Sequence, residues 1–413
     1  MDLFWIDEAR KIKKTYSELI KDICSKQNIK KYVCFDDPYQ VFVELLCSLL
    51  IDEPIEIMDA SLSEVEIQNL GICVAEIERR IPFLIDKLQT PQDLIEKIIS
   101  NNTKWTVSLY TSGTTGKPKK VAHTFKSLTK NVRQGQRFAD HNVWAFAYHP
   151  THFAGLQVFF QAFLNLNAMI YIFDEDKNDI ANIFEKYKVT HISATPTFYR
   201  TLTPCIKGAA ANVERVTLGG EKFDVQLSET LKKCFPNAKI RNIYASTEAG
   251  SLFESENNYF EIKKHIKDHI MVNGDGELLL SSEILGSSDE FKVVDGWYFT
   301  GDIVKFIDDI HIEFIGRKTE MINVAGYKVN PQEIEEEIKK IDGIIDVTVR
   351  ARANKLTGNI IIADVIKNHD VKNIDETYII NFLIKTLQSW KIPRMIKFVS
   401  EIDKTRTGKK VRI

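Results

Sequence analysis

The stretch Leu109–Val121, LYTSGTTGKPKKV, combines residue types that suit the binding of a polyphosphate. Gly113 and Gly116 allow backbone N–H groups to turn toward a ligand and approach it closely. Hydroxyls and ammonium groups surround them, from Thr111, Ser112, Thr114, Thr115, Lys117, Lys119 and Lys120. The spacing is not that of a Walker A loop, because Pro118 stands where that motif has its Mg²⁺-binding Ser or Thr. Taken alone, the stretch also fits a surface loop without a ligand.

A second stretch, Tyr244–Gly250 (YASTEAG), offers groups that suit a nucleotide and its metal ion. The Tyr244 ring is a surface on which adenine can stack. Thr247 offers a hydroxyl that can donate to a phosphate, and Glu248 offers a hard oxygen ligand of the kind that Mg²⁺ prefers. The alternative for Tyr244 is a place in the hydrophobic core, and for Glu248 a solvated surface position.

Five stretches in this order resemble the adenylate-forming superfamily, which includes acyl-CoA synthetases, peptide-synthetase adenylation domains and beetle luciferases. Two are the stretches above, and the others are YFTGD (Tyr298–Asp302), GRKTEMINVAGYKVNPQEIE (Gly316–Glu335) and KTRTGKKVR (Lys404–Arg412). The resemblance implies that a carboxylate attacks ATP, pyrophosphate leaves, and a thiol then takes the acyl group from acyl-AMP. It therefore implies ATP and Mg²⁺, with CoA or phosphopantetheine as the thiol.

For the nucleotide, the resemblance assigns residues that their types alone do not identify. The turn LGGE, with Gly219, Gly220 and Glu221, resembles one that contacts adenine, where glycine lets the backbone approach the base edge. Asp302 would accept hydrogen bonds from both ribose hydroxyls. Arg317, which stays charged at any relevant pH, would contact ribose or phosphate oxygens.

The C-terminal stretches carry the residues that the resemblance assigns to catalysis and movement. Lys409 would bring its ammonium to the attacking carboxylate and the α-phosphate, where it stabilises the charge that develops. Thr319 occupies the hinge position, where the family usually has Asp or Lys. The hinge lets the C-terminal domain rotate between an adenylating and a thioester-forming pose. Gly326 lies where the family brings a pantetheine arm past the backbone.

The stretch Tyr148–Leu156 (YHPTHFAGL) bears on the acid substrate. His152 resembles the family histidine that borders the acyl and pantetheine tunnels. The stretch has no Asp of the kind that amino-acid-activating members use to hold the α-ammonium, which favours an uncharged acid. Ala245 replaces a usual glycine and would narrow the acyl pocket. Aromatic residues that could line this pocket, for an aryl or a medium-chain acid equally, are Phe153, Phe198, Tyr199 and Phe253.

Strand-like and helical segments alternate along the first part of the chain. The runs WTVSLY, VWAFAY, MIYIF and THISATP read as strands, and helices are expected near Phe125–Phe138, Leu156–Leu166 and Ile180–Tyr187. This alternation predicts an α/β fold of mostly parallel sheets with flanking helices. The phosphate-binding stretch is then expected between a strand and a helix, at the edge where open α/β sheets bind ligands.

The pattern of predicted helices and strands changes toward the C-terminus. Short strands and turns between Gly274 and Phe314 predict a β-rich subdomain, and Asn330 is expected to cap a helix. Two β-like runs and an amphipathic helix around Ile379–Trp390 then predict a small α+β domain. We expect an N-terminal domain of residues 1–316 that binds ATP and the acid. A mobile lid domain of residues 317–413 would carry the catalytic lysine.

Composition excludes several classes of protein. The 413 residues are 44% hydrophobic and 27% charged, as in ordinary globular proteins. A net charge of −2 gives no field for nucleic acid or an acidic membrane. Residues 317–413 hold 19 Lys+Arg and 13 Asp+Glu, which fits solvated helix faces or a basic domain that closes over an anion. Six cysteines without a C-x-x-C pair predict reduced thiols in the cytoplasm. Neither a signal peptide nor a membrane span is expected.

We therefore predict an ATP-dependent acid–thiol ligase that adenylates an aryl or fatty acid and transfers it to CoA or to a carrier protein. One alternative is an amino-acid-activating adenylation domain. Another is a non-catalytic nucleotide- or acyl-binding homologue, which the retained Lys409, Glu248 and Asp302 disfavour. Only 109 residues precede Tyr110, so the N-terminal subdomain is expected to be trimmed.

Overall fold

The computed structural model forms two compact units. The first unit comprises Met1–His269 and Leu280–Tyr298, and the second comprises Ile270–Leu279 and Phe299–Ile413. The second unit thus begins upstream of residue 316, and the predicted domain boundary there stays a prediction. The structure describes residues 2–85, 87–101, 103–111, 119–139, 141–221, 223, 225–257, 259–287, 291, 293–324, 327–354, 358–368, 373–403 and 410.

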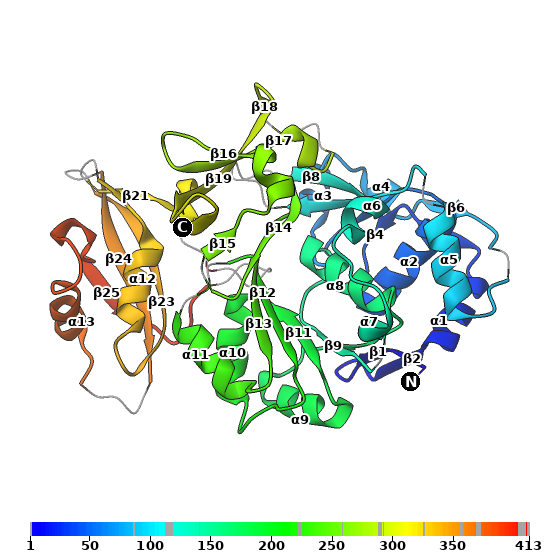
Figure 1. Ribbon diagram of the computed structural model, residues 1–413, viewed down its shortest axis with the longest axis horizontal. Helices are drawn as coiled ribbons and strands as arrows, with labels where there is room; N and C mark the ends of the chain where they lie inside the picture. Colours follow the sequence, from blue (N-terminus) through cyan, green and yellow to red (C-terminus); the bar gives the residue numbers. More distant parts are fainter. Residues whose placement is uncertain are drawn as a thin grey trace. The chain divides into compact units, whose positions relative to one another are not determined.

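An eight-stranded sheet, in the order β14-β13-β12-β11-β9-β10-β1-β2, is the centre of the first unit (Figure 1). Neighbours from β13 to β1 run parallel, whereas β14 and β2 are antiparallel edge strands. The parallel strands therefore end at one edge, where open α/β sheets place ligand sites. The strands are β1 (Leu3–Asp7), β2 (Ile12–Thr15), β9 (Val143–Phe146), β10 (Ala168–Tyr171), β11 (His191–Ala194), β12 (Arg215–Gly219), β13 (Lys239–Ser246) and β14 (Gly250–Ser255).

Two hydrophobic clusters cover the two faces of this sheet. Alternate residues of β9 point to opposite faces, so Phe146 packs in one cluster and Ala145 in the other. The first cluster includes residues of α1 (Tyr16–Ser25), α2 (Pro38–Leu50), α5 (Pro91–Asn101) and α8 (Phe153–Phe163). The second includes residues of α9 (Lys177–Tyr187), α10 (Pro196–Leu202) and α11 (Val225–Cys234). The predicted α/β class is confirmed.

A second sheet has the strand order β4-β5-β7-β8, and its strands β7 and β8 precede and follow the predicted phosphate-binding stretch in the chain. The strands β7 (Thr106–Thr111) and β8 (Lys119–Thr124) form an antiparallel hairpin in which Thr111 pairs with Lys119. The expected passage from strand directly to helix is therefore wrong. Val121 and His123 are buried while the residues beside them are more exposed, and this period of two is that of a strand.

The helix expected over Phe125–Phe138 is likewise two short helices, α6 (Phe125–Thr129) and α7 (Gln136–Ala139). Gly135 lies between them with a φ of +122°, a backbone conformation that interrupts a helix. The remaining helices and strands of the first unit are short. They are β3 (Asn28–Lys30), β4 (Tyr32–Val33), β5 (Ile55–Ile57), α3 (Glu64–Asn69), α4 (Val74–Ile77), β6 (Arg80–Pro82), β15 (Tyr259–Glu261) and β18 (Val293–Val294).

The second unit joins two sheets. Strands β16 (Ile270–Val272), β17 (Glu277–Ser281), β19 (Trp297–Phe306) and β20 (His311–Arg317) form the expected β-rich part. A three-stranded sheet in the order β23-β24-β25 packs with two helices around one core, as predicted for a small α+β domain. Its elements are β21 (Ile322–Val324), β22 (Tyr327–Val329), α12 (Pro331–Lys339), β23 (Ile344–Asn354), β24 (Gly358–Lys367), α13 (Glu376–Leu383) and β25 (Met395–Phe398).

Two details of this small domain test the sequence-based expectations. Asn330 caps α12, since its side chain accepts a hydrogen bond from the Gln332 backbone N–H at 3.0 Å. The amphipathic helix, however, begins at Glu376 and ends at Leu383, earlier than the Ile379–Trp390 expected.

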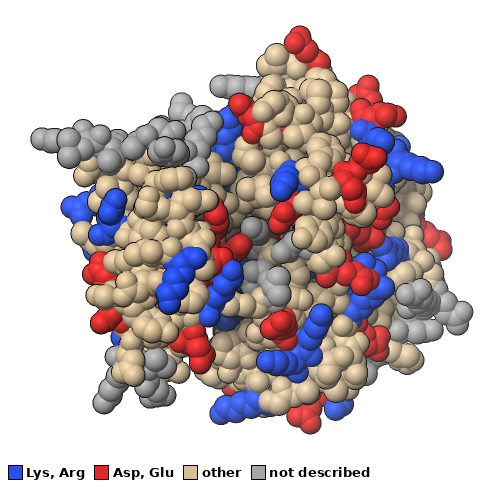
Figure 2. All heavy atoms as spheres, turned by 60° about the vertical axis from the view of Figure 1, so that its left-hand side comes forward, with Lys and Arg blue, Asp and Glu red and all other residues tan. Residues whose placement is uncertain are grey.

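The face of the molecule that Figure 2 presents is mixed in charge. Figure 2 shows Lys and Arg interspersed with Asp and Glu over the face that it presents, without a wide area of one sign. Among the described residues, no helix is long and apolar enough to cross a membrane.

Candidate active site

The carboxyl end of β13 brings together two predicted site residues. Tyr244 of β13 is paired with Phe253 of β14, and their ring centroids are 5.4 Å apart. The strand register shifts between Tyr244 and Ala245, which is a β-bulge. Bulges re-aim side chains and are frequent beside active sites. Tyr244, the predicted adenine platform, and Ala245, predicted to narrow the acyl pocket, are therefore neighbours at an irregular end of β13.

Thr247 and Glu248 lie in the turn between β13 and β14. The Tyr298 hydroxyl donates a hydrogen bond to Glu248 Oε1 at 3.3 Å, and the Gly286 N–H donates to the Glu248 carbonyl at 2.6 Å. Both the side chain and the backbone of Glu248 are thus held. Tyr298 belongs to the YFTGD stretch, so folding brings two of the sequence motifs into contact.

Gly286 also connects this turn with the hairpin around the phosphate-binding stretch. Ser287 pairs with Ala122 of β8 through two backbone hydrogen bonds of 2.9 and 3.2 Å. A Cβ on Gly286 would lie 3.2 Å from the Ala122 carbonyl oxygen and 3.4 Å from that of Glu248. Only glycine fits here without a shift of its neighbours. The strand that leaves the phosphate-binding stretch and the turn that bears Glu248 are therefore adjacent.

The predicted phosphate-binding residues themselves, Ser112, Gly113, Thr114, Thr115, Gly116 and Lys117, lie outside the described residues and stay predictions. The hairpin defines where their stretch begins and ends, at Thr111 and Lys119. Lys120, the last cation of the stretch, ion-pairs with Glu56 at 2.8 Å, and Tyr110 donates to the same carboxylate. Glu56 therefore compensates the Lys120 charge.

The predicted adenine turn follows β12. A Cβ on Gly219 would lie 3.1 Å from the Ile243 carbonyl oxygen, so a side chain there would crowd β13. Gly220 has a φ of +84°, which L side chains rarely adopt. Both glycines are therefore required by the backbone of the turn.

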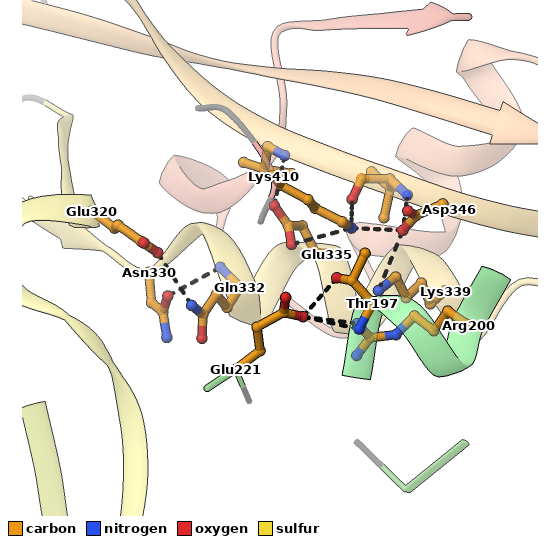
Figure 3. Close-up of polar contacts among 12 residues, drawn as sticks. Thr197, Arg200, Glu221, Glu320, Asn330, Gln332, Glu335, Lys339, Asp346 and Lys410 are labelled. Carbon is orange, nitrogen blue, oxygen red and sulfur yellow. Dashed lines mark hydrogen bonds and ion pairs between the residues drawn. The ribbon is translucent and has the colours of Figure 1, made fainter. Parts of the chain in front are cut away.

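Glu221 completes that turn. Its Oε2 accepts hydrogen bonds from the Thr197 N–H at 3.1 Å and the Thr197 hydroxyl at 2.6 Å, and lies 3.8 Å from an Arg200 nitrogen (Figure 3). Its Oε1 is buried and has no hydrogen-bond partner among the described residues. One carboxylate oxygen is thus committed to the N-terminus of α10, and the other could accept a hydrogen bond from a ligand.

The residues predicted for the acyl pocket do not share one environment. His152 precedes α8 and Phe153 begins it, packed in the first hydrophobic cluster. Phe198 and Tyr199 belong to the second cluster, on the opposite face of the sheet. Tyr199 is fully buried, and its hydroxyl donates to backbone carbonyls of β11 and β12 at 3.1 and 3.0 Å. Tyr199 therefore packs the core, and its place in a pocket stays a prediction.

His123 was not singled out by the sequence and lies against Phe153. The two ring centroids are 4.7 Å apart, and the imidazole is only 2% exposed. Its Nε2 has no hydrogen-bond partner among the described residues, and burial lowers the pKa of His123 to about 4. A Cβ on Gly250 would lie 3.3 Å from the Phe153 ring. His123, Phe153 and Gly250 thus form a tightly packed, uncharged group behind the Glu248 turn.

The second unit carries the predicted ribose-binding residues. Arg317 Nε lies 2.6 Å from Asp302 Oδ1, across the paired strands β19 and β20. Asp302 is 2% exposed, and its N–H donates to the Thr300 hydroxyl at 3.0 Å. Gly301, with a φ of +73°, donates its N–H to Glu277 Oε1 at 3.0 Å. These contacts fix the T-G-D turn and the carboxylate that it presents.

The hinge position lies just beyond this pair. Thr319 is exposed within the 3₁₀ helix η4 (Lys318–Glu320). On one side, Lys318 Nζ lies 2.7 Å from Glu277 Oε2. On the other, Gln332 donates to Glu320 Oε2 at 3.2 Å (Figure 3). Thr319 is therefore flanked by two side-chain contacts, one made by the residue before it and one by the residue after it.

Gly326 and Lys409 lie outside the described residues. Their assigned roles at the thiol tunnel and at the reacting groups stay predictions.

Comparison with protein families identifies the chain. Residues 51–273 match the model described as AMP-binding enzyme, and residues 333–409 match AMP-binding enzyme C-terminal domain. The chain belongs to the AMP-binding enzyme family. The adenylate-forming family expected from the five motifs is confirmed.

Individual relatives of this AMP-binding enzyme are distant. 4-Coumarate–CoA ligase-like 6 of Arabidopsis thaliana is 24% identical over 395 residues, which cover 84% of this chain and 70% of that protein. A 2-succinylbenzoate–CoA ligase of Staphylococcus epidermidis is 26% identical over 325 residues, covering 73% and 67%. The o-succinylbenzoate CoA synthetase of Bacillus subtilis, solved with ATP and magnesium ion, is 16% identical with a TM-score of 0.72, covering 100% of this chain and 96% of that chain. That similarity shows the fold.

Metal binding by this AMP-binding enzyme can be judged from its donor atoms. Within the described parts of the chain, no three His, Cys, Asp or Glu side chains group together as a metal site. Mg²⁺ is commonly held by one or two carboxylates together with substrate phosphates and water. Glu248, fixed in its turn, is a suitable single carboxylate, so the residues present fit a Mg²⁺ ion that arrives with ATP.

Proposed function

We propose that this AMP-binding enzyme is an ATP-dependent acid–thiol ligase that converts a carboxylic acid to its CoA thioester through acyl-AMP. The observation that carries the proposal is the link through Gly286 between the Glu248 turn and β8. That link supports the proposal because it makes the turn of Glu248, the predicted Mg²⁺ ligand, adjacent to the strand that follows the predicted phosphate-binding stretch. A nucleoside triphosphate with its Mg²⁺ is a ligand that would use both the Glu248 carboxylate and the predicted phosphate-binding stretch.

The first half-reaction joins the acid to AMP. A carboxylate oxygen attacks the α-phosphorus, a new oxygen–phosphorus bond forms, and the bond to the bridging oxygen of pyrophosphate breaks with its electron pair on pyrophosphate. The protein contributes mainly positioning and neutralisation of charge. Thr247 binds the α-phosphate, and the Asp302–Arg317 pair binds ribose and phosphate oxygens. Lys409 stabilises the charge between the two anions. Glu248 would hold Mg²⁺, which neutralises phosphate charge when bound.

The second half-reaction transfers the acyl group. A thiolate attacks the carbonyl carbon of acyl-AMP, the carbon–sulfur bond forms, and AMP leaves with the electrons of the carbon–oxygen bond. The thiol proton passes to solvent. Rotation about Thr319 exchanges the pose that needs Lys409 for the pose in which Gly326 borders the pantetheine arm.

An aryl acid is the substrate class that we propose. One relative above is named as similar to 4-coumarate–CoA ligase and another as a 2-succinylbenzoate–CoA ligase, and both of these acids carry an aromatic ring. Phe153 and the neutral, buried His123 provide apolar surroundings near the Glu248 turn. An unpaired α-ammonium would lose its hydration in such surroundings at a large cost. An aryl acid without an ammonium group is therefore favoured over an amino acid.

CoA is the proposed acceptor, because the named relatives are CoA ligases. A carrier protein presents the same phosphopantetheine arm and remains the second candidate acceptor. The six cysteines are all free thiols, which supports the cytoplasm as the compartment.

The proposal is tested by mass spectrometry of the enzyme with Mg·ATP and a panel of acids. The panel contains 4-coumarate, 2-succinylbenzoate, benzoate, octanoate and the twenty amino acids. We expect acyl-AMP from at least one aryl acid, and its conversion to a thioester when CoA is added. Acyl-AMP from amino acids alone would contradict the substrate class, and no adenylate from any acid would contradict the proposed activity.

A further inference from the structure

Lys410 carries a buried ammonium group near the end of the chain. Its side chain is only 6% exposed, and its Nζ lies 2.6 Å from Asp346 Oδ1. The ammonium also donates to the Val347 carbonyl oxygen and lies 3.9 Å from Glu335 Oε2 (Figure 3). Burying a charge is unfavourable unless the charge is both paired and hydrogen-bonded. Lys410 meets both conditions, unlike an ordinary solvated tail lysine.

The receiving side of this contact belongs to the small α+β domain. Asp346 starts β23 and also lies 3.5 Å from Lys339 Nζ of α12. Burial alone would raise the pKa of Asp346, but Lys410 and Lys339 lower it to about 2, so the carboxylate is ionised at neutral pH. Glu335 of α12 accepts the Val349 N–H of β23 at 2.8 Å. A helix and a strand that share one core thus build the acceptor site.

We propose that Lys410 is a positioning residue, whose buried ion pair with Asp346 anchors the C-terminal segment to the small domain and thereby limits where Lys409 can reach. The proposal rests on the proposed function in one respect, namely that Lys409 acts on the reacting groups. Adjacent Cα atoms lie about 3.8 Å apart. Fixing Lys410 therefore confines the origin of the Lys409 side chain to a small region.

The energetic reason for such an anchor is the flexibility of lysine. A lysine side chain has four rotatable bonds, and an unanchored backbone adds its own freedom to them. Catalysis by a charged group depends on holding it close to its productive position, and a misplacement of about 1 Å can cost about a hundredfold in rate. An anchor one residue away removes most of the backbone contribution to that misplacement.

The test compares Lys410→Met with the wild type and with Lys340→Met. Methionine has a similar volume without the charge. Lys340 is an exposed lysine of the same domain that pairs with Glu337, so it controls for the loss of one positive charge. Asp346→Asn removes the other partner. Three measurements are made on the full chain: hydrogen exchange of the C-terminal peptide, ATP–pyrophosphate exchange with 4-coumarate or 2-succinylbenzoate, and thioester formation from synthetic acyl-AMP and CoA.

We expect Lys410→Met and Asp346→Asn to speed hydrogen exchange of the C-terminal peptide roughly tenfold. They should lower kcat for pyrophosphate exchange about 10- to 100-fold with little change in the KM for ATP. Thioester formation from supplied acyl-AMP, which bypasses Lys409, should stay within about twofold. Lys340→Met should match the wild type throughout.

Two results would overturn the anchor. One is that Lys410→Met and Asp346→Asn leave both the hydrogen-exchange rate of the C-terminal peptide and the rate of pyrophosphate exchange as in the wild type. The other is a parallel loss of both half-reactions with a lower melting temperature, which would make Lys410 a merely structural residue. If the wild type activates no acid at all, the proposed function fails, while hydrogen exchange still decides whether the ion pair holds the segment.

Discussion

Arg317 Nε lies 2.6 Å from Asp302 Oδ1, so the two residues assigned to the ribose and phosphates form one ion pair across β19 and β20. Neither residue then acts alone. The Asp302 carboxylate is buried, and the guanidinium compensates its charge before any nucleotide binds. In the proposed function, the ion pair would hold the carboxylate in place to accept hydrogen bonds from the ribose hydroxyls.

The first prediction concerns this pair. Asp302→Asn and Arg317→Met should each raise the KM for ATP about 10- to 100-fold, since hydrogen bonds to charged groups contribute about 1.5–3 kcal/mol. The double variant should raise the KM for ATP by less than the product of the two single-variant factors, because the two side chains are in contact. ATP titrations of pyrophosphate exchange measure all three. Strictly multiplicative losses would show that the two side chains bind ATP independently.

The second prediction concerns Glu248. Glu248→Gln keeps the shape of the side chain and its contact with Tyr298 but removes the charge that suits Mg²⁺. We expect kcat for pyrophosphate exchange to fall about a hundredfold and the Mg²⁺ concentration for half-maximal rate to rise. Tyr298→Phe removes only the 3.3 Å hydrogen bond to Glu248, so its kcat for pyrophosphate exchange should fall about tenfold or less. A Glu248→Gln enzyme with unchanged Mg²⁺ dependence would contradict the metal role.

Much of this site follows from local sequence signals. Gly219 and Gly220 are required by a close approach and a positive φ, and Asn330 caps its helix as its type indicates. Glycines and caps act within a few residues of the backbone, so a single sequence reveals them. The order of five motifs then identified the family.

The unpredicted parts depend on distant partners. Lys410 and Asp346 are 64 residues apart in the chain, and the sequence around Lys410 looks like a solvated tail. His123 becomes notable only when Phe153 packs on it, and Gly286 only when Ala122 and Glu248 close around it. The β7–β8 hairpin was missed because β8 begins with two lysines and has no apolar run like that of β7, so its pairing with β7 decided its conformation. Long-range contacts of this kind leave no local pattern.

The third prediction concerns the hinge. Lys318 Nζ, next to Thr319, lies 2.7 Å from the buried Glu277 Oε2 and 3.5 Å from Asp275 Oδ2. Lys318, Glu277 and Asp275 all precede Thr319 in the chain, so this contact holds the backbone on the N-terminal side of the proposed hinge. Lys318→Met should therefore loosen the backbone from which the C-terminal domain would rotate, and change the ratio of pyrophosphate exchange to thioester formation about two- to fivefold. Lys305→Met, at an exposed position on β19, is the control. Equal changes in both half-reactions would argue against a role in switching.

The fourth prediction concerns His123 and acid stability. Burial lowers the pKa of His123 from 6.5 to about 4, whereas the unfolded chain keeps the ordinary value. Between these values the unfolded state binds more protons, so the free energy of unfolding falls as the pH falls from about 6.5 to about 4. The shift corresponds to about 3 kcal/mol. His123→Leu removes this contribution while keeping an apolar side chain beside Phe153.

Urea unfolding of the wild type and His123→Leu at several values between pH 4 and 7 measures the effect. Burial also lowers the pKa values of His149 and His191, so both proteins should lose stability in acid. The difference between them isolates His123, because the other histidines are common to both. We expect the free energy of unfolding of His123→Leu to rise relative to that of the wild type as the pH falls. Parallel pH profiles would mean that His123 is protonated as easily in the folded protein as in the unfolded chain, and that water reaches its imidazole beside Phe153.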